Sequence, residues 1–160
     1  MALSIQHPAQ TRRPFGAAIF ERGTGRLLAP QRQLVTSLDC SVFHAAMVGS
    51  MTTQSKIGDF DLGGPGRPLY ELVVGTDLCA MFLGATLSGS ASSTSCAAPA
   101  TRTPERFGFD EGVKPAEWVA APERRGITVE RDILGDKAAS VLWEYAGSRG
   151  EVYDANQDGS

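Results

Sequence analysis

A histidine and a cysteine are the residues of this chain whose types and positions suggest chemistry. His44 stands in the stretch DCSVFHAAM (residues 39–47), where a loop of small polar side chains runs into a predicted helix. Cys79 stands in TDLCAMFLGA (residues 76–85), at the start of a second predicted helix. Imidazole and thiolate groups are zinc ligands, and a thiol at a helix N-terminus is also a candidate nucleophile. Read alone, each stretch is only a loop that leads into a helix.

The elements that would position His44 come early in the chain. The sequence predicts a strand, a hairpin turn, a second strand, a loop and a helix over residues 15–20, 21–25, 26–34, 36–42 and 43–55. Pro30 weakens the second strand and favours an edge position or a bulge. For the helix, the spacing predicts a buried face made of Phe43, Met47 and Met51.

The rest of the chain continues the alternation of strands and helices. The sequence predicts a strand, a helix, two short strands and a final helix over residues 69–74, 78–87, 91–96, 127–130 and 137–147. The first of these strands is a nearly continuous apolar run, which fits burial on both faces. Asp136 is the predicted N-cap of the final helix, whose apolar face holds Ala138, Val141, Leu142 and Tyr145.

This order of elements predicts a layered α/β domain. We expect a single domain over residues 1–160, with an irregular arm over residues 1–13 and a polar tail over residues 150–160.

Composition excludes several classes of function. The chain has 160 residues, of which 42% are hydrophobic and 21% charged, as is typical of one globular domain. The net charge of -3 offers no basic field for a phosphate backbone, so we expect no nucleic-acid partner. No apolar run approaches the roughly 20 residues that span a bilayer, so we expect no membrane partner either. Three cysteines at no disulfide-scaffold spacing favour a reduced, cytoplasmic setting.

The stretches around His44 and Cys79 resemble the two motifs of the purine and pyrimidine deaminases. Those enzymes carry His-x-Glu on one helix and Pro-Cys-x-x-Cys at the start of the next. In them the histidine and both cysteines hold zinc, and the glutamate moves protons. Further similar fragments follow in the same order, namely RPFGAAI, LVTSLD, FDL followed by LY, CAMFLGA, FGFDE and EVYD.

The chain is therefore similar to the cytidine/deoxycytidylate deaminase superfamily, most of all to its guanine deaminase branch. This resemblance implies a three-layer α/β/α cytidine-deaminase-like fold with a central mixed sheet.

The departures from the family pattern fall on the zinc site. Ala46 stands in place of the proton-moving glutamate, and Phe82 in place of the third zinc ligand. His44 and Cys79 supply only two ligands, whereas catalytic zinc uses three protein ligands and a water. We therefore expect no zinc, no other cofactor and no hydrolytic deamination. A set of Cys40, His44 and Cys79, which would restore three ligands, is the alternative.

By the same resemblance, His44 and Cys79 face one point. Two ligands of a tetrahedral zinc lie roughly 3.5 Å apart, which without the metal is the distance of a cysteine–histidine pair. One hypothesis makes Cys79 a thiolate nucleophile and His44 its base or acid. The other makes Cys79 an inert buried thiol and His44 a hydrogen-bonded relic.

Four further side chains are substrate-binding candidates by the resemblance. Gln33 takes the place of an asparagine that holds the substrate, with a solvated loop as an equal alternative. Asp77 takes the place of a glutamate ahead of the cysteine and either binds substrate N–H groups or caps the helix. Asp39 either orients His44 or grips a substrate amine, with helix capping as the alternative. Phe82 either fills the metal's space or stacks on the substrate.

Tyr153 is a candidate of a different kind. It lies in a C-terminal segment that, in the guanine deaminase branch, crosses to the neighbouring subunit and helps to close its pocket. A frayed tail is the alternative. We expect a dimer or a hetero-oligomer.

Three functions are consistent with these residues. The first is an enzyme repurposed for metal-independent chemistry on a small nitrogen-containing molecule, in bacterial specialised metabolism, with Cys79 and His44 as catalytic residues. The second is a pseudoenzyme that binds or scaffolds an active partner. The third, and least favoured, is a nucleobase deaminase with a rebuilt metal site.

Overall fold

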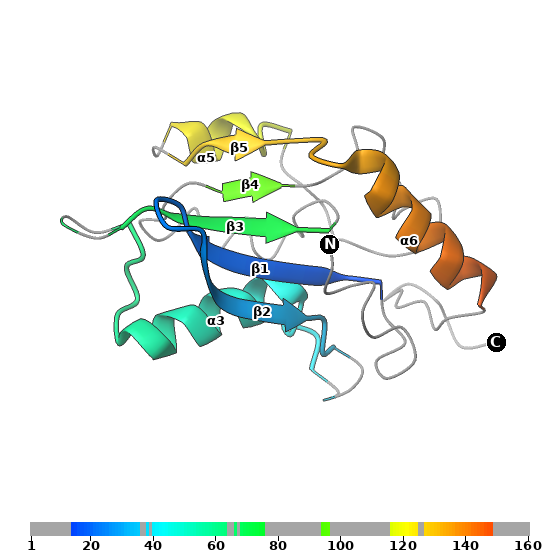
Figure 1. Cartoon of the computed structure of the whole chain (residues 1–160), viewed down its shortest axis with the longest axis horizontal. Coiled ribbons are helices and arrows are strands. Elements are labelled where there is room, and N and C mark those ends of the chain that lie inside the picture. Colours follow the sequence, from blue (N-terminus) through cyan, green and yellow to red (C-terminus); the bar gives the residue numbers. More distant parts are fainter. Residues whose placement is uncertain are drawn as a thin grey trace.

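The computed structural model describes residues 14–35, 38, 40–63, 66, 68–75, 94–96, 116–124 and 127–148 (Figure 1). Within these residues, five strands form one sheet in the order β2-β1-β3-β4-β5. The strands are β1 Gly16–Glu21, β2 Arg26–Arg32, β3 Tyr70–Val74, β4 Thr94–Cys96 and β5 Val129–Glu130. The described helices are α3 Ala45–Ile57, α5 Ala120–Glu123 and α6 Gly135–Gly147. The predicted α/β class, with helices packed on a central mixed sheet, is confirmed.

Strands β1 and β2 form the predicted hairpin. The turn closes with a 2.8 Å hydrogen bond from the Gly25 N–H to the Glu21 carbonyl, and Gly25 has a φ of 67°, which glycine adopts without strain. Pro30 pairs with Ala18 on the outer strand of the sheet, and a register shift falls between Ile19 and its neighbour. The edge position and the irregularity predicted from Pro30 are therefore both present.

Four strands point in one direction, and β1 points in the other. Strand β1 is antiparallel to both β2 and β3, while β3, β4 and β5 pair in parallel. The carboxyl ends of β2, β3, β4 and β5 therefore lie at the same side of the sheet, which we call the carboxyl edge. In open α/β sheets, ligands bind outside the carboxyl ends of the strands.

Helix α3 covers one face of the sheet (Figure 1) and contributes to the main core. The buried members of that core are Ala17, Ile19, Ala45, Ala46, Tyr70, Leu72 and Val74. The prediction of a buried face made of Phe43, Met47 and Met51 is wrong for Met51, whereas Met47 is half-buried and packs against this core. Met51 is 49% exposed, and the buried residues of α3 are Ala45, Ala46, Gly49 and Thr53. Small side chains face the sheet because they let the helix backbone approach it closely.

Strand β3 is less buried than its sequence predicts. Tyr70, Leu72 and Val74 are buried, whereas Glu71 and Val73 between them are only half-buried. The strand therefore has one fully covered face, which is the face that packs against α3 in the main core.

Helix α6 is found where the sequence predicts it, but its start differs. Leu134, with a φ of 60°, is the N-cap, and no side chain caps the helix, so the prediction of Asp136 as N-cap is wrong. Leu142 and Tyr145 are buried and pack against Phe15 ahead of β1.

Several predictions lie outside the described residues. They are the helix over residues 78–87, the arm over residues 1–13 and the tail over residues 150–160. Among the described helices, none has the length and apolar character needed to cross a membrane.

One described side chain in the core predicts a stabilising substitution. The Thr53 hydroxyl is fully buried and has no hydrogen-bond partner among the described residues. We expect Thr53→Val to raise the free energy of unfolding by about 1 kcal/mol, because it removes an unsatisfied polar group at nearly constant shape. Chemical denaturation measures this change.

Thr52→Val is the matched control for that substitution. The Thr52 hydroxyl accepts a 3.4 Å hydrogen bond from the Gln31 amide, so its loss brings no gain. A lower unfolding midpoint for Thr53→Val than for the wild type would contradict the prediction.

Candidate functional site

The end of β2 and the start of α3 meet at the carboxyl edge. Three hydrogen bonds show that α3 runs antiparallel to β2. Lys56 Nζ donates to the Leu28 carbonyl at 2.7 Å, and Gln31 Nε2 donates to Thr52 Oγ1 at 3.4 Å. Beyond the two elements, the Leu34 N–H donates to the Phe43 carbonyl at 2.9 Å. The last of these bonds places the residues that flank it, Gln33 and His44, in neighbouring positions.

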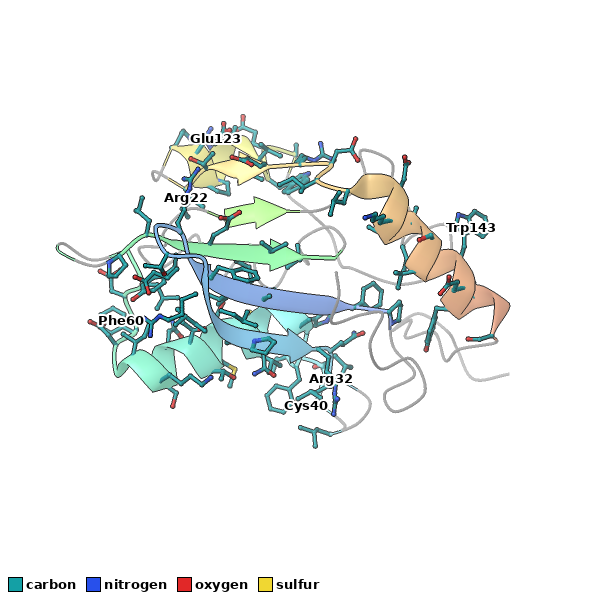
Figure 2. All side chains as sticks on the ribbon, viewed as in Figure 1. Arg22, Arg32, Cys40, Phe60, Glu123 and Trp143 are labelled. Carbon is teal, nitrogen blue, oxygen red and sulfur yellow. The ribbon has the colours of Figure 1, made fainter. Side chains whose placement is uncertain are left out.

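The loop between Leu34 and Phe43 is held by its own backbone. The N–H of Leu38 donates to the carbonyl of Leu34 at 3.0 Å, and the N–H of Cys40 donates to the carbonyl of Val35 at 2.8 Å. Figure 2 shows Cys40 near the end of β2 that carries Arg32, and away from the hairpin turn. These bonds fix the direction in which the chain enters α3.

His44 is the N-cap residue of α3. It has an extended backbone, with φ of −63° and ψ of 149°, and its carbonyl accepts a 3.0 Å hydrogen bond from the Val48 N–H. Its side chain is half-buried. An imidazole at this place is a candidate for proton transfer to a ligand at the carboxyl edge.

Gln33 is a buried amide beside that helix start. It is only 4% exposed, and its backbone N–H donates to the Phe15 carbonyl at 3.2 Å. Side chains two residues apart on a strand share a face, and Gln31 faces α3 through its bond to Thr52. Gln33 directly follows the last residue of β2, on the side of the strand that carries Gln31 and α3. Its side-chain amide makes no hydrogen bond with the described part of the chain.

The first turn of α3 has no side-chain cap within the described part of the chain. Its first N–H groups have no partner inside the helix, and the turn holds no acidic residue. Ala45 and Ala46 follow His44, and both are buried in the main core. Position 46 therefore carries no group that can accept or donate a proton.

The zinc ion that the deaminase resemblance implies does not fit this donor set. Of the described residues, Cys40 and His44 are the metal-binding types near the site, and Cys40 is a half-buried free thiol. Among the described residues, no three His, Cys, Asp or Glu side chains come together. Phe82 cannot coordinate a metal, and it stands where the family has its third ligand. The absence of zinc stays a prediction.

The structure brings two of the predicted site residues together. Gln33 and His44 are neighbours, whereas Asp39, Asp77, Cys79, Phe82 and Tyr153 lie outside the described residues. The segment that leads to Asp77 and Cys79 leaves from the same edge, because Gly75, directly after β3, donates its N–H to the Gly16 carbonyl at 3.0 Å.

The first turn of α3, which no described side chain caps, is the feature that the sequence analysis missed. The sequence offers a signal for it, because the residues after His44 are Ala45 and Ala46, with no acidic side chain in that turn. Its pairing with Gln33 depends on the alignment of β2 with α3, which only the structure supplies.

Models of protein families give no match to this chain, and neither do curated proteins. Solved structures do match. The guanine deaminase from Nitrosomonas europaea is 37% identical, with a TM-score of 0.84, covering 91% of this chain and 80% of that one. NE0047 in complex with 2,6-diaminopurine is 36% identical, with a TM-score of 0.86, covering 96% of this chain and 81% of that one. A variant of NE0047 in complex with 8-azaguanine is 37% identical, with a TM-score of 0.85, covering 92% of this chain and 80% of that one.

These matches correct the function inferred from the sequence. The hypotheses of an enzyme repurposed for other, metal-independent chemistry and of a pseudoenzyme scaffold are wrong, because more than 90% of the chain follows guanine deaminase structures at 36% to 37% identity. Positions 46 and 82 depart from the family pattern, but the rest of the domain follows it. The predicted resemblance is confirmed: the chain belongs to the guanine deaminase family, within the cytidine deaminase-like fold.

Proposed function

We propose that this chain is a nucleobase deaminase whose substrate is an aminopurine bound at the carboxyl edge. The proposal is supported by relatives that bind 8-azaguanine and 2,6-diaminopurine and resemble this chain over more than 90% of its length. The observation that carries it is the buried Gln33 amide, which lies beside the start of α3 next to His44. A buried amide is costly unless it is hydrogen-bonded, and a bound ligand would supply its partner.

The reaction replaces an amino group of the ring with oxygen. The oxygen of water forms a bond to the ring carbon that carries the exocyclic amine, the C–N bond breaks, and the nitrogen leaves as ammonia with a proton that came from the water. His44 is the described side chain that can take this proton and return it. Gln33 offers one acceptor and two donors, which can orient the purine.

Ala46 limits this reaction. A positioned general acid or base contributes about a hundred- to ten-thousand-fold to a rate. Because the family's proton-moving position is occupied by a methyl group, we expect slow turnover in the wild type. In the family, zinc activates the water; no step proposed for this chain passes through a metal.

The remaining predicted site residues complete the proposed pocket. Cys79 joins His44 at the reacting end, Asp39 and Asp77 accept N–H groups of the purine, and Phe82 stacks on the ring. Tyr153 reaches the pocket of the partner subunit in a dimer, as the resemblance implies. Single substitution of each, with 8-azaguanine affinity as the readout, tests these assignments.

Binding and turnover of purines test the proposed function. Titration calorimetry of the purified chain should show one 8-azaguanine bound per chain, and incubation with guanine should release ammonia and xanthine slowly. Gln33→Leu should weaken 8-azaguanine binding about tenfold or more, because it removes the hydrogen bonds of a buried amide. Gln31→Leu is the control on the same face of β2. If no purine binds at concentrations of about 1 mM, where an affinity near −4 kcal/mol would still be seen, the proposal fails.

A further inference from the structure

The side of the sheet opposite α3 carries a group of side chains near the hairpin turn. Phe20 of β1 pairs with Leu27 of β2 and with Glu71 of β3. The Arg22 N–H extends the pairing of β1 with β3 by one residue, through a 2.8 Å hydrogen bond to the Leu69 carbonyl. Paired residues share a face and successive residues alternate, so these five side chains point away from the face that α3 covers. We call Phe20, Arg22, Leu27, Leu69 and Glu71 the back face.

The back face is apolar where a solvated face would be polar. Leu69 is 58% exposed, Leu27 is 46% exposed and Phe20 is half-buried. On the face that α3 covers, Ile19 and Leu72 are only 2% and 5% exposed. Antiparallel strands with one face in water usually carry polar side chains on that face, and grouped exposed apolar side chains mark a contact surface.

Arg22 and Glu71 give the back face one charge of each sign. They are diagonal neighbours on adjacent strands, a relation that places such residues about 7–8 Å apart. Neither makes an ion pair with the described part of the chain. Figure 2 shows Arg22 at the hairpin end, away from Cys40 and the carboxyl edge. A surface that packs on its own copy needs both signs, because charges of one sign would repel each other across the two-fold axis.

The edge of β2 is a poorer surface for contact with a second chain. Pro30 has no N–H to donate to a further strand, and the Leu28 carbonyl already accepts a 2.7 Å hydrogen bond from Lys56 Nζ. Strand addition at this edge is therefore disfavoured, whereas the back face stays accessible.

We propose that the back face is a contact surface between two copies of this chain, related by a two-fold axis that passes between Arg22 and Glu71. Each Arg22 then lies opposite Glu71 of the partner subunit, and Leu27 and Leu69 are buried between the copies. The contact lies at the end of the sheet opposite the carboxyl edge, so the proposed function does not depend on it.

Charge reversal tests the pairing, with sedimentation of the full chain at several concentrations as the measurement. Arg22→Glu and Glu71→Arg should each weaken self-association about tenfold or more, because each variant brings two like-charged pairs together. An equal mixture of the two variants should associate again, because both pairs between unlike copies then join opposite charges. An effect confined to one chain cannot produce this recovery.

Variants on α6 are the matched controls. Lys137→Glu and Glu144→Arg, at exposed positions, make the same changes in net charge and should leave association unchanged. Leu69→Ala should weaken association about tenfold or more, because it removes apolar surface buried in the contact. Leu134→Ala, at a side chain that is 55% exposed ahead of α6, should not.

Three outcomes would overturn the proposal. One is a wild-type chain that stays monomeric at about 0.1 mM. Another is an oligomer whose mass is unchanged in Arg22→Glu and in Glu71→Arg, because that oligomer forms through a different surface. The third is weaker association of both folded variants without recovery in their mixture, because Arg22 and Glu71 then do not pair between copies.

Discussion

Ala46→Glu should raise the rate of purine deamination by about a hundred- to ten-thousand-fold. The substitution returns a carboxylate to the first turn of α3, two residues after His44. A glutamate there can take a proton from the attacking water and deliver one to the leaving amine, which no side chain at position 46 does in the wild type. The rate of ammonia release from guanine measures the gain.

Ala46→Glu should also lower the stability of the fold. Ala46 is 5% exposed and belongs to the main core with Ile19 and Leu72. A longer side chain must turn from this core towards the carboxyl edge, and a carboxylate left in an apolar environment costs several kcal/mol unless it is protonated or hydrogen-bonded. We therefore expect Ala46→Glu to lower the melting temperature while it raises the rate.

Ala45→Glu is the matched control for Ala46→Glu. Ala45 lies in the same turn, is 7% exposed and belongs to the same core, so a glutamate there carries a comparable stability cost. It should lower the melting temperature without raising the rate. An Ala46→Glu protein that is folded by circular dichroism and binds 8-azaguanine, yet releases ammonia no faster than the wild type, would show that the missing carboxylate does not limit turnover.

The hairpin and the sheet could be predicted from local signals, whereas the packing of α3 could not. Residues around Gly25 and Pro30 dictate a turn and an edge strand whatever surrounds them, and both are found. The buried face of α3 depends instead on how closely its backbone approaches β1 and β2. Close approach selects Gly49 and Thr53 over the larger Met51, so the pattern of large apolar residues was wrong for Met51.

The site residues named from the sequence stay predictions, and the structure describes two of them, Gln33 and His44. Gln33 and His44 were named from the motifs that resemble the family, and the structure places them as neighbours. The pairing of Gln33 with the start of α3 could not be predicted, because it depends on the antiparallel alignment of β2 with α3.

Removing the imidazole should abolish the activity that Ala46→Glu restores. In the Ala46→Glu background, His44→Ala should lower the rate of ammonia release by about a hundredfold or more, because the N-cap imidazole is the proposed partner of the new carboxylate in proton transfer. Binding of 8-azaguanine should change little, since Gln33 and the backbone of α3 still hold the purine. This separation of rate from affinity distinguishes a catalytic role for His44 from a structural one.

His7→Ala, at the other histidine of the sequence, is the control for His44→Ala and should leave the rate unchanged.

Metal analysis of the same proteins adds a second readout. The donor set around His44 predicts far less than one zinc ion per chain in the wild type, with no change on substitution. Stoichiometric zinc that is lost in His44→Ala would contradict this prediction and would point to Cys40, His44 and Cys79 as the ligands. In that case the carboxylate gained at position 46 would act next to a metal ion, and the rate lost with His44 would measure metal binding instead of proton transfer by the imidazole.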